Sequence, residues 1–236
     1  MQTRSKYLKQ LEGLEASLTR LAEKATADVR AAGASLSGEE GAADAAEAVL
    51  AGSEAERRLR AEIERACLDI MLLQQPLVAD DLRFVSGAFR AVSDIAHIDS
   101  MTRDVAYLSQ GIPAEETAEL RGVFAELSER CAVMVETAFD AFRSSSEERA
   151  NEVYALDDEV DRLYHQAEAI VVGLIRSAAD DAEIEFMPEL FMVAKYFERM
   201  GDDAQRLADW AVFRATGEHE VYSVAHSKKG AEPTGE

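Results

Sequence analysis

The sequence predicts an all-α protein, and three observations carry that prediction. Apolar residues recur in steps of three and four through almost the whole chain of 236 residues, the spacing of one helix face. No stretch alternates convincingly with a period of two, as a half-buried strand would. Only four prolines occur, and proline interrupts helices. We therefore expect a bundle of six long helices.

Each expected helix follows from its own apolar stripe or from the space between two stripes. The first, second, fourth and fifth stripes run over residues 7–25, 59–73, 120–138 and 153–174, and the third and sixth helices are expected at about 81–109 and 185–214. Polar breaks separate them at 33–41, at 75–76 with Asp80 as a cap, and at 111–113, 144–146 and 180–181. Pro188 predicts that the sixth helix begins near that residue or kinks there.

The chain also shows an internal repeat. Sliding it against itself by 102 residues superposes the third and sixth helices with coinciding apolar pairs such as Phe89/Phe191, Ile95/Phe197 and Ile98/Met200. The matching order of helices and breaks predicts two pseudo-repeated three-helix units. We place them at residues 1–110 and 114–216, and we expect residues 217–236 to form a frayed polar tail.

The net charge limits the classes of molecule that the protein could bind. The chain has 46 acidic and 25 basic residues, a net charge of -21, so it would repel nucleic acids and anionic membranes and would attract cations. The longest apolar run, residues 169–175, is too short to span a bilayer, and the N-terminal residues lack the apolar stretch of a secretion signal. We therefore expect a cytoplasmic protein without direct membrane insertion.

Known catalytic motifs are missing from the sequence. It contains no phosphate-binding glycine loop, no dinucleotide fingerprint and no nucleophile elbow. Cys67 and Cys131 lie in helical patterns without metal-binding or redox spacing, so we expect two reduced helix cysteines. A non-enzymatic protein is the expectation.

Two acid pairs are candidates for chemistry. Asp157 and Asp161, and likewise Glu198 and Asp202, are four residues apart, so each pair projects from one helix face. About nine such pairs are expected by composition alone, so spacing is weak evidence. Their position says more, because both pairs border apolar seams, where like charges need a cation, a proton or an arginine.

Two further residues bear on this candidate site. Gly201 lies inside the same helix as Glu198, and a glycine there costs on the order of 1 kcal/mol and usually marks a close approach. His165 is one turn beyond Asp161 and is either a further ligand or, more often in such settings, a surface or packing histidine. An all-oxygen ligand set favours Mg, Ca, Mn or Fe over Zn. The alternative is that the acids pair with arginine and lysine from a neighbouring helix or a partner.

Two longer phrases carry a family resemblance. Gln74-Gln-Pro-Leu-Val-Ala-Asp-Asp-Leu-Arg83, together with Ala194-Lys-Tyr-Phe-Glu-Arg-Met-Gly-Asp202 and the later Ala208-Asp-Trp210, strongly resembles the PhoU family of phosphate-signalling regulators. The resemblance implies tandem three-helix units in which the second and third helices carry E(D)xxxD motifs that bind metal clusters. It implies that Asp157, Asp161, Glu198 and Asp202 hold a divalent or trivalent ion of the Fe, Mn or Mg class.

The first unit departs from that family pattern. Its equivalent positions are Ser53, Arg57, Ala96 and Ser100, so all four ligand positions are lost together. We therefore expect a cation in the second unit only. Asp94, Asp99 and Asp104 lie nearby but off the motif, and we interpret them as surface or interhelix charges.

The resemblance also implies a function. It describes a negative regulator of phosphate uptake and of the phosphate-sensing two-component pathway, a homodimer that contacts the transporter ATPase PstB and the sensor kinase PhoR. One alternative is an accessory regulator of another phosphate carrier. The other is a di-metal carboxylate oxidase, which would need two Glu-x-x-His pairs, whereas the nearest match is the single Asp94-Ile-Ala-His97.

Overall fold

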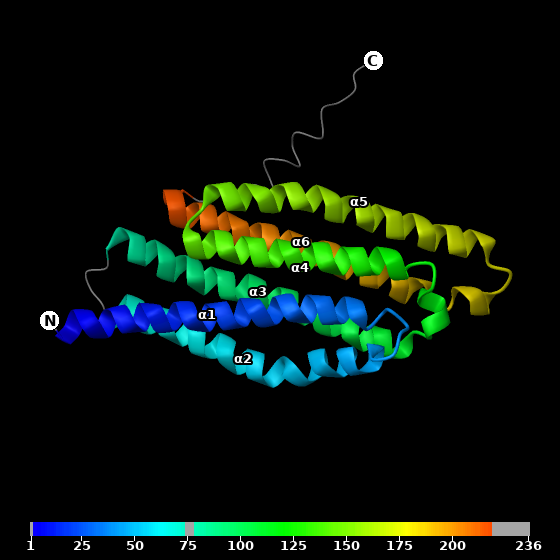
Figure 1. Ribbon diagram of the computed structural model, residues 1–236, viewed down its shortest axis with the longest axis horizontal. Coiled ribbons are helices and arrows are strands. Elements are labelled where there is room, and N and C mark those ends of the chain that lie inside the picture. Colours follow the sequence, from blue (N-terminus) through cyan, green and yellow to red (C-terminus); the bar gives the residue numbers. More distant parts are fainter. Residues whose placement is uncertain (1, 74–77, 219–236) are drawn as a thin grey trace, which may run out of the picture.

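The computed structural model describes residues 2–73 and 78–218, and over these residues it is helical apart from short connections. The described part contains no strand, and the all-α prediction is confirmed (Figure 1). Six long helices and two 3₁₀ turns follow one another as α1 (Gln2–Ala34), α2 (Ala42–Leu73), α3 (Ala79–Gly111), η1 (Ala114–Thr117), α4 (Arg121–Ser144), α5 (Glu147–Ser177), η2 (Asp181–Ile184) and α6 (Met187–Thr216).

The starts of α6 and α3 can be compared with those predicted from the sequence. Helix α6 begins at Met187 with Pro188 in its first turn, as one of the two predicted outcomes required. The predicted cap at Asp80 is wrong. Helix α3 instead begins after the extended residue Val78, and Asp80 lies in the first turn, where it pairs with Arg83. The break at 75–76 and the tail from residue 219 lie outside the described residues.

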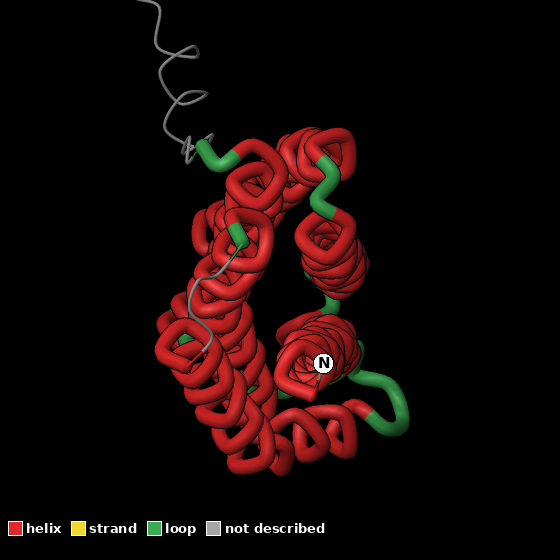
Figure 2. The backbone as a smooth tube through the Cα atoms, turned by 90° about the vertical axis from the view of Figure 1, so that its left-hand side faces the viewer, coloured by secondary structure: helices red, strands yellow, loops and turns green. Residues whose placement is uncertain are grey.

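The helices form two three-helix units, α1–α3 and α4–α6, as the repeat predicted. Within each unit all three helices contact one another, and the units are joined by α3 against α6 and by α1 against α4. Figure 1 shows the second unit above the first, and Figure 2 looks nearly along the helices of the resulting stack. One large hydrophobic core draws buried residues from all six helices, and Ala46, Val49 and Ala106 form a small second cluster.

Burial largely repeats between the units. The buried residues of α1 fall on buried residues of α4 with a shift of 106, and most of those of α3 and α2 match buried residues of α6 and α5 with shifts of 102 and 104. Examples are the pairs Leu18/Phe124, Ala25/Cys131, Val29/Val135, Val49/Val153, Ile63/Ala167, Ile95/Phe197 and Val105/Leu207. The two units are therefore one backbone framework carrying two sets of side chains.

None of the described helices has a stretch that is both long and apolar enough to cross a membrane.

Candidate metal centre

The structure brings the four predicted acids together where α5 packs against α6. Asp157 and Asp161 come from α5, and Glu198 and Asp202 come from α6. The close approach occurs at Gly201, where a Cβ atom would lie 3.4 Å from the Oδ1 atom of Asp157. The glycine inside the helix therefore leaves room for a carboxylate of the facing helix, as its cost in helix stability suggested.

The four carboxylates repel one another. Burial, together with the charges of Asp161, Asp202 and other neighbouring acids, raises the pKa of Asp157 to about 7. Burial followed by the charge of Glu198 raises the pKa of both Asp161 and Asp202. A proton or a cation is thus favoured at this contact of the two helices.

The basic groups nearby leave part of this charge unmatched. Lys195, on the same helix as Glu198, donates to its Oε1 atom over 2.6 Å. The other oxygen, Oε2, is buried and accepts no hydrogen bond from any residue that the structure describes. An orphaned carboxylate oxygen beside three further carboxylates is a donor set that suits a hard cation. The residues of the second unit therefore fit a metal ion of that class.

The oxygen atoms are not gathered for one ion, however. Among the residues that the structure describes, no three of these four carboxylates place oxygens within 4.8 Å of one another. Binding of one ion by all four requires their side chains to move closer together.

Two other predictions from the sequence concern His165 and the two cysteines. His165 is largely exposed, and its Nδ1 atom lies 3.2 Å from Glu168, which fits the surface histidine better than the further ligand. Cys67 and Cys131 are free and buried, as predicted. Burial raises the pKa of the Cys67 thiol to about 12, and the Cys131 thiol donates to the carbonyl of Phe197. Both thiols are therefore protonated and shielded.

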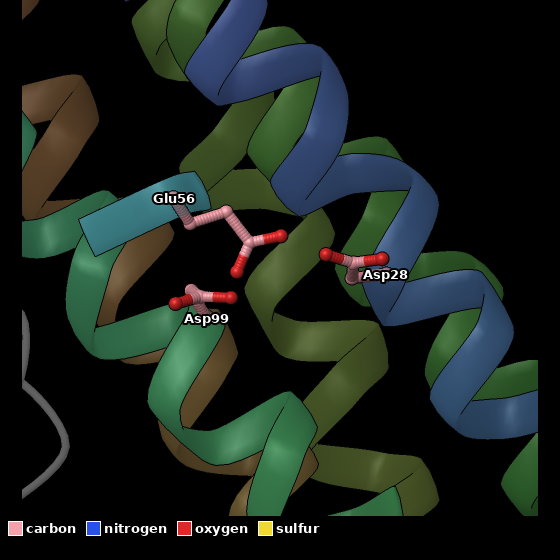
Figure 3. A group of neighbouring side chains, drawn as sticks. All are labelled: Asp28, Glu56 and Asp99. Carbon is pink, nitrogen blue, oxygen red and sulfur yellow. The ribbon is translucent and has the colours of Figure 1, made fainter. Parts of the chain in front are cut away.

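The structure contains a second carboxylate cluster that the sequence did not reveal. Asp28 of α1, Glu56 of α2 and Asp99 of α3 point toward one another in the first unit (Figure 3). One oxygen of each lies within 4.8 Å of the others, and all three residues are at least nine-tenths buried. We call these three residues the acidic triad.

Two basic side chains neutralise much of the acidic triad. Lys24 forms ion pairs with Asp28 and, over 2.9 Å, with Glu56. Arg103 forms an ion pair with Asp99 and approaches Glu56 to 3.6 Å. Three carboxylates thus share two fixed cations, which leaves one negative charge in excess.

That excess charge appears in the pKa values. Burial raises the pKa of Asp28 to about 6, against the opposing pull of Lys24. Burial, a hydrogen bond with Glu56 and the charge of Glu56 raise the pKa of Asp99 to about 7. Burial also opposes ionisation of Glu56, but hydrogen bonds with Asp99 and Lys24 outweigh it and lower its pKa. The triad is therefore expected to take up a proton as the pH falls through about 7, first on Asp99.

The triad borders the place where the first unit lost its predicted ligands. Ser53, Arg57 and Ala96 line a cavity of about 450 Å³ together with Glu56 and Asp99, whereas Ser100 is exposed. Glu56 and Asp99 each stand one residue before a lost position, so their side chains turn inward. A shift of 104 aligns Glu56 with Val160 and a shift of 106 aligns Asp28 with Met134, so these comparisons would have marked both acids as buried charges.

The other off-motif acids behave as expected. Asp94 is an interhelix charge, because it accepts a hydrogen bond of 2.9 Å from the indole of Trp210 across the contact of α3 with α6. Asp104 is exposed.

Comparison with known proteins now decides the family. The model of the PhoU domain matches the chain twice, at residues 18–108 and 124–211. The chain belongs to the PhoU family. The phosphate-specific transport system accessory protein PhoU homolog of Caulobacter vibrioides strain NA1000 is 30% identical over 217 residues, which cover 90% of each chain. The homolog of the same description in Clostridium acetobutylicum is 24% identical over 67% of this chain and 72% of its own.

Solved PhoU structures share the fold. The crystal structure of PhoU from Pseudomonas aeruginosa gives a TM-score of 0.80 at 22% identity and covers 90% of this chain and all of that one. The phosphate transport system regulatory protein PhoU from Streptococcus pneumoniae gives 0.78 at 20% identity, over 91% and 99% of the two chains. The two matched domain copies coincide with the two three-helix units of the fold.

Proposed function

We propose that this protein is an accessory protein of a phosphate-specific transport system that lowers phosphate uptake and holds the phosphate-sensing kinase inactive when phosphate is plentiful. One observation carries the proposal: a relative described as a phosphate-specific transport system accessory protein aligns with nine-tenths of the chain, and two PhoU domain copies account for both units. Its action is by protein contact, in the cytoplasm, with the transporter ATPase PstB and the sensor kinase PhoR as partners and with the homodimer as the working form.

The long charged helices support a docking role. Exposed acids and bases both occur along α5, and such a face is suited to contacts with partner proteins that form and dissociate. The proposal assigns no catalytic residue and no turnover to the chain.

A complementation experiment tests the regulatory role. The chain is expressed in a bacterium that lacks its own PhoU, and uptake of radioactive phosphate and a kinase-dependent reporter are measured in high phosphate. Both should fall to the level of the parent strain, and the purified chain should retain PstB on an affinity column. Uptake that falls only through a carrier without PstB would support the alternative, an accessory regulator of another phosphate carrier.

We further propose that the second unit binds a divalent or trivalent cation through Asp157, Asp161, Glu198 and Asp202. The ion would supply positive charge that offsets four carboxylates and cross-links α5 to α6. The support is the orphaned oxygen of Glu198 and the mutual repulsion that raises the pKa of Asp157.

Calorimetric titration of the metal-free protein with Mn²⁺ tests this site. Asp202→Asn should weaken binding at least tenfold, because it removes one of the charged ligands. The matched control is Asp158→Asn, an exposed acid on the same helix as Asp157 but outside the four, which should bind as the wild type does. Equal affinity in all three proteins would refute the assignment.

A further inference from the structure

The acidic triad occupies a three-helix junction that exists twice in this molecule. The repeat shifts align Asp28 with Met134, Glu56 with Val160 and Asp99 with Gly201. These three second-unit residues also meet, since a Cβ atom on Gly201 would lie 3.4 Å from Val160 and 3.6 Å from Met134. The second unit fills the junction with apolar groups, so the same backbone positions do not require charge.

The charged junction of the first unit has an occupant. The ammonium group of Lys24 pairs with both Asp28 and Glu56, and it reaches them from α1 along a side chain that is 40% exposed. The repeat aligns Lys24 with Arg130, which turns outward to Glu159 at 3.0 Å. A basic group directed into the junction is therefore a feature of the first unit.

We propose that Lys24 is the resident cation of the first unit. Its ammonium group, assisted by Arg103, fills the junction that a metal ion would otherwise bridge, so the first unit joins its three helices without metal. Three carboxylate oxygens within 4.8 Å of one another span the distance that a single hard cation can bridge. A divalent ion is excluded because the ammonium group of Lys24 already lies between the oxygens of Asp28 and Glu56, where the ion would have to bind.

The proposal assigns the exclusion of divalent cations from the first unit to the side chain of Lys24. Removing the charge of Lys24 while leaving the triad intact should turn the junction into a divalent-cation site. The inference goes beyond the proposed regulation of phosphate transport and does not depend on it.

The test counts Mn²⁺ ions bound to the full-length protein by native mass spectrometry and calorimetry. The background is Asp202→Asn, which weakens the proposed second-unit site. In this background Lys24→Met should gain one Mn²⁺ equivalent, and adding Asp28→Asn should abolish the gain. Lys9→Met, an exposed lysine on the same helix, is the matched control and should gain none.

Several outcomes would overturn the proposal. A folded Lys24→Met variant, with wild-type circular dichroism, that gains no ion would do so. So would a protein that retains Lys24 and yet loses one Mn²⁺ equivalent on Asp28→Asn, and this second arm needs no Lys24 variant. If Asp202→Asn leaves Mn²⁺ binding unchanged, the second-unit assignment fails. The gain on Lys24→Met is then still measured as the difference in bound Mn²⁺ between the Asp202→Asn protein and the same protein that also carries Lys24→Met.

Discussion

In the first unit the helices meet around Asp28, Glu56 and Asp99, whereas in the second they meet around apolar residues and carry their carboxylates at the edge of the seam. The inner acids have basic partners built into the fold, namely Lys24 and Arg103. The four acids of the second unit, Asp157, Asp161, Glu198 and Asp202, mostly face one another. Glu56 and Asp99 stand only one residue away from the motif positions. This shift of one residue places them in an ion-pair network with Lys24 and Arg103, whereas acids at the motif positions of the second unit favour binding of a cation.

The energetic consequences differ as well. A buried ion network rarely adds stability over an apolar core of similar volume, but removing one member leaves a charge that is costly to bury. The first unit should therefore tolerate concerted changes better than single ones. The second unit should tolerate apolar changes at its junction and resist any new charge there.

Moving an acid into the second junction should give the largest effect. Gly201→Asp places a carboxylate at the position equivalent to Asp99, beside Asp157 and without an inward basic partner, and should destabilise the metal-free protein by about 3 kcal/mol. Urea denaturation measures this. Gly201→Ala is the control, because its Cβ makes ordinary contacts at 3.4 Å and improves helix propensity, so it should change stability by less than about 1 kcal/mol. Equal losses in both variants would show that space rather than charge sets the cost.

Breaking the first network should give a smaller loss. Arg103→Met removes the partner of Asp99, and because Arg103 is partly exposed the cost should be about 2 kcal/mol. Adding Asp99→Asn removes the carboxylate that lost its partner and should restore part of that stability. The double-mutant cycle by thermal and urea unfolding checks the coupling. Strictly additive effects would argue against a shared network.

The sequence predicted the architecture well, because the signals for it were local and repeated. The three-and-four spacing identified four helices, the space between their stripes predicted α3 and α6, and Pro188 located the start of α6. The predicted cap at Asp80 was wrong because the helix begins two residues earlier, after the extended residue Val78. Local patterns identify helices more reliably than their ends.

The site was predictable only where it repeated a local pattern. Asp157 and Asp161 form a pair one helical turn apart, and the structure does place that pair against Glu198 and Asp202. The acidic triad has one member on each of three helices, so no spacing along the chain joins them. Only the packing of α1, α2 and α3 makes Asp28, Glu56 and Asp99 neighbours.

The smallest expected effect is a change in pH dependence. Asp99 has a folded-state pKa of about 7, above its ordinary value of 3.8, so the native state binds more protons than the unfolded state between those values. The contribution of Asp99 to the free energy of unfolding is therefore fully present below about pH 4 and is lost as the pH rises to about 7. The groups that face Asp99 are Glu56 of α2, Asp28 and Lys24 of α1, and Arg103 of its own helix.

Asp99→Asn should flatten that decline. The amide does not ionise, so between pH 5 and pH 8 the variant should lose on the order of 1 kcal/mol less unfolding free energy than the wild type. Asp28 and Asp157 titrate in the same window with the same sign, so the difference between variant and wild type isolates Asp99. The control is Asp104→Asn, an exposed acid on the same helix, whose urea unfolding should follow the wild type at every pH. Parallel curves for Asp99→Asn and the wild type would mean that Asp99 is ionised throughout, and that the triad keeps one excess negative charge beside Lys24 and Arg103.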